Sequence, residues 1–129
     1  MRSILKFKRK NGDYKTKDRD FIWETHKGIH YLCYPFFIYK RENCWVLTHV
    51  SSGAEVCNTN TLFVAKYIAT RLLPVPQFLL PHKDLVSYMT QEQKTYCQDI
   101  ISRYRDRTPD VVKKLDKICP YSIWQTTHT

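Results

Sequence analysis

Histidine and cysteine side chains that could bind a metal ion form two groups in the sequence. Nitrogen and sulfur ligands of this kind suit zinc. No Cys-x2-Cys pair is present, however, and Cys33 and Cys57 fall on expected strands, where a cysteine is more simply a small interior residue. We therefore expect no metal and no other cofactor, while a zinc site stays open as an alternative. The two groups are His26, His30 and Cys33 and, further along, Cys44, His49 and Cys57.

Acidic side chains that could serve a nuclease occur near the N-terminus. Asp18, Asp20 and Glu24 are the best candidates, because metal-dependent phosphodiester cleavage needs clustered carboxylates. Asp18 and Asp20 alternate with Lys17 and Arg19, however, and alternating charges are typical of a solvated segment. We do not expect catalysis at these carboxylates.

Covalent catalysis by a cysteine also lacks the residues that it would need. Cys44 or Cys57 could pair with His49, but no nucleophile elbow and no third orienting group is visible. The three glycines are isolated from one another, so no glycine-rich loop could cradle a phosphate. The sequence therefore predicts a protein that is not an enzyme.

Basic side chains are in excess, and the excess is concentrated at the N-terminus. The chain has 21 Lys and Arg against 12 Asp and Glu, a formal net charge of +9. Cations of this kind neutralise phosphates and aromatic rings stack on bases, so we expect contact with nucleic acid, DNA or RNA. A charged edge strand that resists aggregation is the alternative explanation. The expected nucleic-acid-binding residues are Lys6, Lys8, Arg9, Lys10, Tyr14, Lys15, Lys17 and Arg19.

The strands that would carry these residues begin the chain. Residues 3–10 alternate apolar and basic side chains and lead into Asn11-Gly12, a strong signal for a hairpin turn, with residues 14–17 returning. A charged link over residues 16–20 follows. Two short strands, 21–23 and 29–34, are then expected around a turn at Lys27-Gly28.

The next two segments are rich in β-branched and aromatic residues and predict adjacent antiparallel strands over 36–40 and 44–50. Ser51-Ser52-Gly53 suits a hairpin loop with Gly53 in the left-handed region, which would pair Leu47 with Cys57. With this register, one face of the sheet would carry Trp45, Leu47, His49, Glu55 and Cys57, and the other Val46, Thr48, Val50 and Val56.

A helix is predicted over residues 61–73, with Thr59 or Asn60 as its N-cap. Helical spacing places Leu62, Ala65, Ile68, Ala69 and Leu72 on its buried side. Its outer side would carry Phe63, Lys66, Tyr67, Thr70 and Arg71. Because a solvated face rarely needs two aromatic rings, we expect a contact surface for a partner there. The candidate partner-binding residues are Phe63, Lys66, Tyr67, Arg71 and His49.

The remainder of the chain predicts helices after a proline-rich connection. Pro74, Pro76 and Pro81 favour an extended segment over 74–82. A short helix or turn is then expected over 84–89. Thr90 and Gln93 form a capping-box pattern for a helix to about residue 106, and Thr108-Pro109 begins a final helix to residue 119. The tail, 120–129, would dock only through Ile123 and Trp124.

These elements predict a single α+β domain over residues 1–129. An antiparallel sheet of about five strands would pack on the helix over 61–73, with two or three further C-terminal helices. The odd number of cysteines and the lack of a secretory or spanning apolar segment predict a soluble, cytoplasmic protein that does not enter membranes. The oligomeric state is not indicated.

Two functions follow as expectations. The first is a small non-enzymatic protein that binds nucleic acid through a basic N-terminal hairpin. The alternative is an inhibitor or adaptor, of the kind found among phage or plasmid accessory proteins, that docks a basic and aromatic surface on an acidic host protein.

Overall fold

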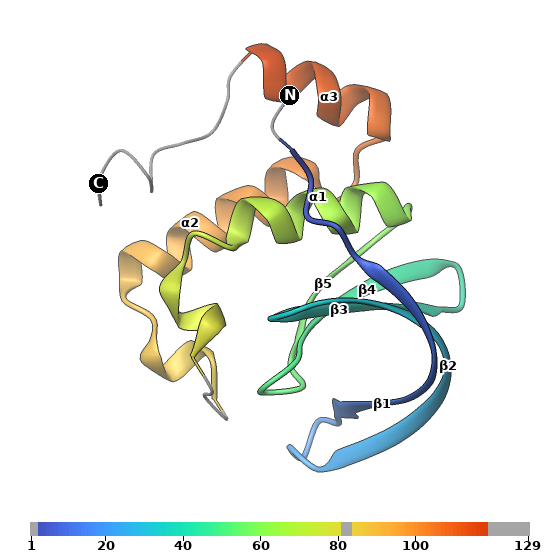
Figure 1. Cartoon of the computed structure of the whole chain (residues 1–129). Helices are drawn as coiled ribbons and strands as arrows, with labels where there is room; N and C mark the ends of the chain where they lie inside the picture. Colours follow the sequence, from blue (N-terminus) through green and yellow to red (C-terminus); the bar gives the residue numbers. More distant parts are fainter. Residues whose placement is uncertain (1–2, 81–83, 119–129) are drawn as a thin grey trace.

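The fold is α+β, as predicted: a five-stranded antiparallel sheet precedes the helices. The computed structural model describes residues 3–80 and 84–118. The sheet follows chain order, β1-β2-β3-β4-β5, so each strand pairs with its neighbours in sequence. The helices gather on one side of the sheet, and the β1–β2 hairpin curls beneath the other side (Figure 1). The strands are β1 (Lys8–Lys17), β2 (Trp23–Cys33), β3 (Phe36–Arg41), β4 (Cys44–His49) and β5 (Glu55–Thr59).

A basic hairpin is present at the N-terminus, but the predicted turn at Asn11-Gly12 is wrong. β1 runs through Gly12 without reversing and pairs with β2, with Gly12 directly opposite Gly28. The turn predicted at Lys27-Gly28 is wrong for the same reason. Both glycines have positive φ values, 152° and 147°, so they permit the long hairpin to bend sharply where a turn was expected.

The chain reverses instead at residues 18–22. The Asp18 carboxylate accepts hydrogen bonds from the backbone N–H groups of Asp20 and Ile22, at 2.8 and 2.9 Å, and Phe21 adopts a φ of 61°. Many turns are stabilised in this way, by an aspartate that accepts hydrogen bonds from nearby backbone N–H groups. Residues 3–7 precede β1 and lie along the helix over residues 62–72, where the Leu5 N–H donates to the Thr70 hydroxyl at 3.0 Å.

The β3–β4–β5 part of the sheet matches the prediction except at one β-bulge. β3 and β4 pair as expected, Leu47 lies opposite Cys57, and Gly53 has a φ of 70°. A register shift between Leu47 and Thr48 places Glu55 opposite Thr48. Glu55 therefore shares a face with Thr48, and its predicted place beside Leu47 is wrong.

Helix α1 (Leu62–Leu72) covers one face of this sheet. Its N-cap is Thr61, whose hydroxyl accepts from the Val64 N–H at 3.3 Å, so the predicted caps, Thr59 and Asn60, are wrong. The predicted buried stripe is confirmed except at Leu62, which is only half-buried. The core forms where this stripe meets the sheet, with Phe36, Ile38, Leu47 and Cys57 packed against Ala65, Ile68, Ala69 and Leu72.

The C-terminal helices pack on the other side of α1. Two 3-10 turns, η1 (Pro76–Leu79) and η2 (Val86–Tyr88), lead to α2 (Gln91–Tyr104) and α3 (Pro109–Ile118). The connection is thus less extended than predicted, because Pro76 begins η1 and Phe78 is buried. The predicted caps are confirmed: Thr90 and Gln93 exchange hydrogen bonds of 3.1 and 2.9 Å, and the Val111 N–H donates to the Thr108 hydroxyl at 3.3 Å.

Some predictions lie outside the described residues, among them the docking of Ile123 and Trp124. Within the described ranges, every helix is too short or too polar to cross a lipid bilayer.

Candidate functional site

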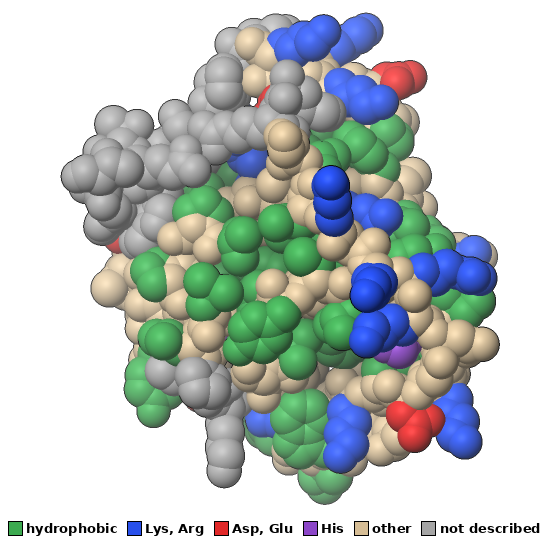
Figure 2. All heavy atoms as spheres, in the orientation of Figure 1, with side chains coloured by type: hydrophobic (Ala, Val, Ile, Leu, Met, Phe, Trp, Pro, Cys, Tyr) green, Lys and Arg blue, Asp and Glu red, His purple; other side chains and the backbone are tan. Residues whose placement is uncertain are grey.

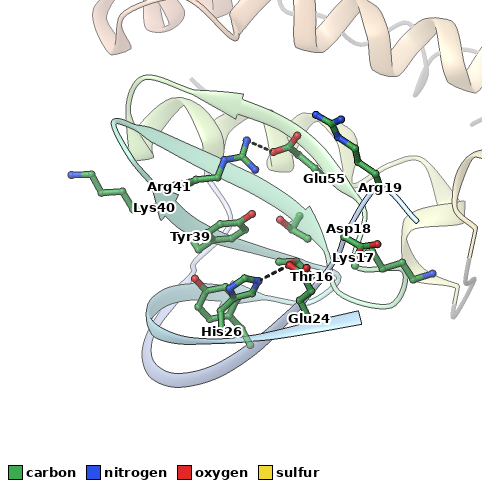
Figure 3. Close-up of a pocket in the computed structure, with 13 residues that line it drawn as sticks. Thr16, Lys17, Asp18, Arg19, Glu24, His26, Tyr39, Lys40, Arg41 and Glu55 are labelled. Atoms are coloured by element: carbon green, nitrogen blue, oxygen red, sulfur yellow. Dashed lines mark hydrogen bonds and ion pairs between the residues drawn. The ribbon is translucent and has the colours of Figure 1, made fainter. Parts of the chain in front are cut away.

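The curled sheet encloses a cleft of about 700 Å³ on its concave face (Figure 3). One wall comes from the turn end of the β1–β2 hairpin, and the other from β3, β4 and the loop before β5. The bulge in β4–β5 turns Glu55 toward this face. The residues that line the cleft are Tyr14, Thr16, Lys17, Asp18, Arg19, Glu24, His26, Tyr39, Lys40, Arg41, Thr48, Gly53 and Glu55.

Aromatic rings from three strands meet in the cleft. The Tyr14 ring stacks on His26, with centroids 5.5 Å apart and an interplanar angle of 24°, and its centroid lies 5.1 Å from that of Tyr39. The register places Tyr14 opposite His26, and the bend of the hairpin at Gly12 and Gly28 brings Tyr14 back over Tyr39. Burial raises the pKa of both Tyr14 and Tyr39, so the two phenols stay protonated and can donate hydrogen bonds at neutral pH.

Polar side chains in the cleft are partly engaged with one another. The Thr16 hydroxyl and His26 Nε2 lie 2.9 Å apart, and Glu24 Oε2 lies 3.7 Å from the same nitrogen. Arg41 forms an ion pair of 2.7 Å with Glu55 (Figure 3). Thr48 differs: it is 1 % exposed, and its hydroxyl has no hydrogen-bond partner among the described residues. A buried hydroxyl without a partner is uncommon and requires an explanation.

The charges around the cleft are mixed. Lys17, Arg19, Lys40 and Arg41 contribute cations, while Asp18, Glu24 and Glu55 contribute carboxylates. Glu55 forms an ion pair with Arg41, and the Asp18 carboxylate accepts hydrogen bonds from backbone N–H groups in the turn. Two of the lysines pack on indole rings, Lys17 over Trp23 at 5.3 Å and Lys40 over Trp45 at 5.6 Å. The lining of the cleft therefore combines aromatic rings, hydrogen-bonding groups and charges of both signs.

The residues predicted to bind nucleic acid are mostly exposed, but they do not form one surface. Lys6 lies before β1, and Arg19 lies in the turn. Strand alternation places Lys8 and Lys10 on the concave face with Tyr14, whereas Arg9 and Lys15 are on the opposite face. Figure 2 shows Lys and Arg side chains spread along one side of the molecule, from α3 to the hairpin.

Five of these cations take part in no ion pair between the described residues. The ion pairs between described residues involve His26, Arg41, Arg71 and Arg105, so Lys6, Lys8, Arg9, Lys10 and Lys15 take part in none of them. Lys17 is half-buried, with its Nζ over the Trp23 ring, so it contributes to the packing of the fold and also lines the cleft.

Three of the five predicted partner-binding residues, Tyr67 and Arg71 on α1 and His49 on β4, are buried, so their expected exposure is wrong. Tyr67 and Arg71 are 1 % and 2 % exposed, because α2 and α3 cover the side of α1 that was expected to face solvent. His49 is also fully buried: its Nε2 donates to the Phe78 carbonyl at 2.7 Å, and its Nδ1 lies 2.8 Å from the Ser52 hydroxyl. Phe63 and Lys66 remain half-buried and pack against Lys113 and Tyr31, respectively.

The candidate metal ligands are distributed between different environments. His26 lies in the cleft, and His30 Nδ1 lies 3.2 Å from the Gly28 carbonyl oxygen. Across residues 3–80 and 84–118, no three His, Cys, Asp or Glu side chains come close enough to hold a metal ion. Cys33, Cys44, Cys57 and Cys97 are free thiols, and burial raises the pKa of Cys57 and Cys97 to about 12.

Seven lining residues of the cleft belong to none of the candidate sites expected from the sequence: Thr16, Tyr39, Lys40, Arg41, Thr48, Gly53 and Glu55. The period-two pattern of β3 does place Phe37, Tyr39 and Arg41 on one face, so that signal was available. The sheet curvature and the bulge at Glu55 depend on contacts between strands. Neither of them is marked by a pattern in the sequence. Comparison of the chain with protein-family models, curated proteins and solved structures finds no match.

Proposed function

We propose that the protein binds nucleic acid through the β1–β2 hairpin. The observation that carries this proposal is the set of exposed, unneutralised cations on β1 and in the segment before it. Exposed lysines and arginines that lack acidic partners gain most from phosphates, since binding releases the counterions condensed on the nucleic acid. Lys8 and Lys10 on one face of the hairpin and Arg9 and Lys15 on the other would contact the backbone.

Salt titration of oligonucleotide binding tests this proposal. We expect single-stranded and duplex oligonucleotides to bind at low salt and to dissociate steeply as salt rises. The double variant Lys8→Glu/Lys10→Glu should weaken binding by at least tenfold. It should also lower the slope of log affinity against log salt by about one per lost phosphate contact. Fluorescence anisotropy of a labelled 12-mer measures both quantities.

The matched control is Lys114→Glu/Lys117→Glu on α3, which makes the same change in net charge at two exposed positions far along the chain. Circular dichroism checks that both variants fold. If neither oligonucleotide binds the wild-type protein at low salt, or if the α3 variant loses as much affinity as the hairpin variant, hairpin binding is refuted.

A second candidate function is docking on an acidic protein, as an inhibitor or adaptor would. Exposed apolar side chains at the tip of the hairpin favour it, since Phe21 is 77 % exposed and Ile22 and Trp23 are also exposed beside the basic strand. Apolar patches rimmed by charge are typical of protein interfaces. Capture of one acidic protein in stoichiometric amount from a nuclease-treated lysate, lost in a Phe21→Ser/Ile22→Ser variant, would favour this function over the first.

A further inference from the structure

The concave cleft has the size of a binding site for one small organic group. Its volume, about 700 Å³, lies within the roughly 300 to 1,000 Å³ of sites for cofactors and similar ligands. Its aromatic side chains suit a planar ring. His26 keeps 41 % of its side-chain surface exposed while it is stacked on Tyr14, so an inserted ring can extend an existing stack.

Thr48 provides an independent sign of a ligand. Thr48 is a lining residue of the cleft, and its buried hydroxyl has no hydrogen-bond partner among the described residues. A hydroxyl both donates and accepts, so the polar edge of a nucleobase or a sugar hydroxyl would satisfy it. A ligand that hydrogen-bonds to this hydroxyl would thereby offset the cost of its desolvation.

Charge limits which nucleotide ligand fits. Asp18, Glu24 and Glu55 line the same cleft as the four cations, so a free nucleoside triphosphate would meet carboxylates as well as arginines. A nucleotide within a strand carries a single charge per phosphate. Its backbone can continue past the exposed Arg19 or along the face of β1 that Lys8 and Lys10 share with Tyr14.

We propose that the cleft accepts one unpaired nucleotide of a single strand whose backbone is held by the β1–β2 hairpin. The base stacks against His26 and Tyr14, and its edge hydrogen-bonds to Thr48. Bases in a duplex have both faces covered by their neighbours, so the cleft discriminates in favour of single strands. This inference rests on the proposed function and specifies its ligand.

A Thr48→Val variant tests the inference without a change of shape. Valine replaces the unpaired hydroxyl by a methyl group, so the protein should remain folded with an unchanged or higher melting temperature. We expect affinity for a single-stranded 12-mer to fall by several-fold and affinity for the duplex to stay the same. Thr95→Val is the matched control, because Thr95 is an exposed residue of α2, outside both the hairpin and the cleft.

A fluorescent base reports the stacking directly. A 12-mer with one 2-aminopurine should lose fluorescence when it binds the wild-type protein, and His26→Ala should reduce that quenching. If the 12-mer binds and Lys8→Glu/Lys10→Glu weakens it, but Thr48→Val and His26→Ala behave as wild type, the cleft inference is refuted and hairpin binding stands. Equal affinity for duplex and single strand also refutes it. If no oligonucleotide binds at low salt, both proposals fail together.

Discussion

Arg71 and Asp116 are buried together where α1, α2 and α3 meet. Arg71 Nη1 lies 3.7 Å from Asp116 Oδ1, and the Tyr67 hydroxyl donates to the same carboxylate oxygen. Burial and this hydrogen bond raise the pKa of Tyr67. The guanidinium nitrogens have no hydrogen-bond partner among the described residues, so Asp116 is the group that compensates the buried charge.

Removal of Asp116 should therefore be costly. Asp116→Ala leaves the Arg71 charge buried without compensation, and we expect the free energy of unfolding to fall by about 3 to 5 kcal/mol. The double variant Arg71→Met/Asp116→Leu removes both charges and keeps the volume, so it should recover most of that loss. Urea denaturation measures both values. A double variant as unstable as Asp116→Ala would show that the loss comes from packing and not from the orphaned charge.

The cysteines differ in burial, and this predicts their reactivity. Burial raises the pKa of Cys57 and Cys97 from 9.0 to about 12, so both remain thiols at pH 8 and should resist a thiol reagent until the protein unfolds. Cys33 and Cys44 are half-buried and should react first. Ellman titration with and without urea measures this in a Cys119→Ser background, since Cys119 lies outside the described residues.

The raised pKa values of Cys57 and Cys97 also make the stability of the protein depend on pH. A thiol whose pKa is higher in the folded state keeps its full contribution below pH 9, the unfolded value, and loses it as pH rises toward 12. We expect the free energy of unfolding to decline over that window, and Cys57→Ala should flatten the decline.

For the labelling experiment, fast reaction of Cys57 and Cys97 at pH 8 without urea would contradict their burial.

At the scale of elements, the β1–β2 hairpin is attached to the rest of the sheet near Gly53. The Lys17 N–H donates to the Gly53 carbonyl at 3.2 Å, and the Trp23 ring packs over the glycine. A Cβ at position 53 would lie 2.6 Å from Trp23 Cζ3, and the φ of +70° disfavours any side chain. This contact holds the end of the hairpin against the β4–β5 loop, where the cleft is formed.

Gly53→Ala should accordingly loosen the hairpin. We expect a loss of about 1 to 3 kcal/mol from backbone strain together with the clash. Trp23→Leu in the same chain should restore the part that is due to the clash, while Gly12→Ala has no neighbouring atom within 4 Å and should cost less. Thermal melts of the three variants distinguish these terms. A Gly53→Ala protein as stable as wild type would mean that Trp23 does not pack on this glycine in solution.

The same elements show why the hairpin was only partly predictable. Asn11-Gly12 and Lys27-Gly28 carry turn signals, yet the two glycines lie opposite each other within one long strand pair. Glycine favours turns and sharp strand bends for the same reason, its freedom at positive φ, so its position alone does not distinguish them. Capping is different, because Thr90 with Gln93 and Thr108 with Pro109 act within a single turn of chain, and both were predictable.

At the scale of the whole molecule, the two faces of the sheet have different structural roles. One face builds the core with α1, and the long β1–β2 hairpin curls beneath the other face (Figure 1). The cleft lies on this second face (Figure 3). The unneutralised cations lie on the hairpin that forms the cleft wall. If both proposals hold, the backbone of a bound strand and one of its bases are recognised by the same two strands.

Local patterns in the sequence determined much of this protein. Segments rich in β-branched and aromatic residues predicted β3 and β4, helical spacing predicted the buried side of α1, and cap residues predicted the starts of α2 and α3, because each signal depends on residues a few positions apart. Only tertiary structure decided the burial of Tyr67, Arg71 and His49, which depends on α2, α3 and η1 packing over them. The cleft likewise exists only because distant strands curl together, so it brings Tyr14, Thr48 and Glu55 to one place from separate parts of the chain.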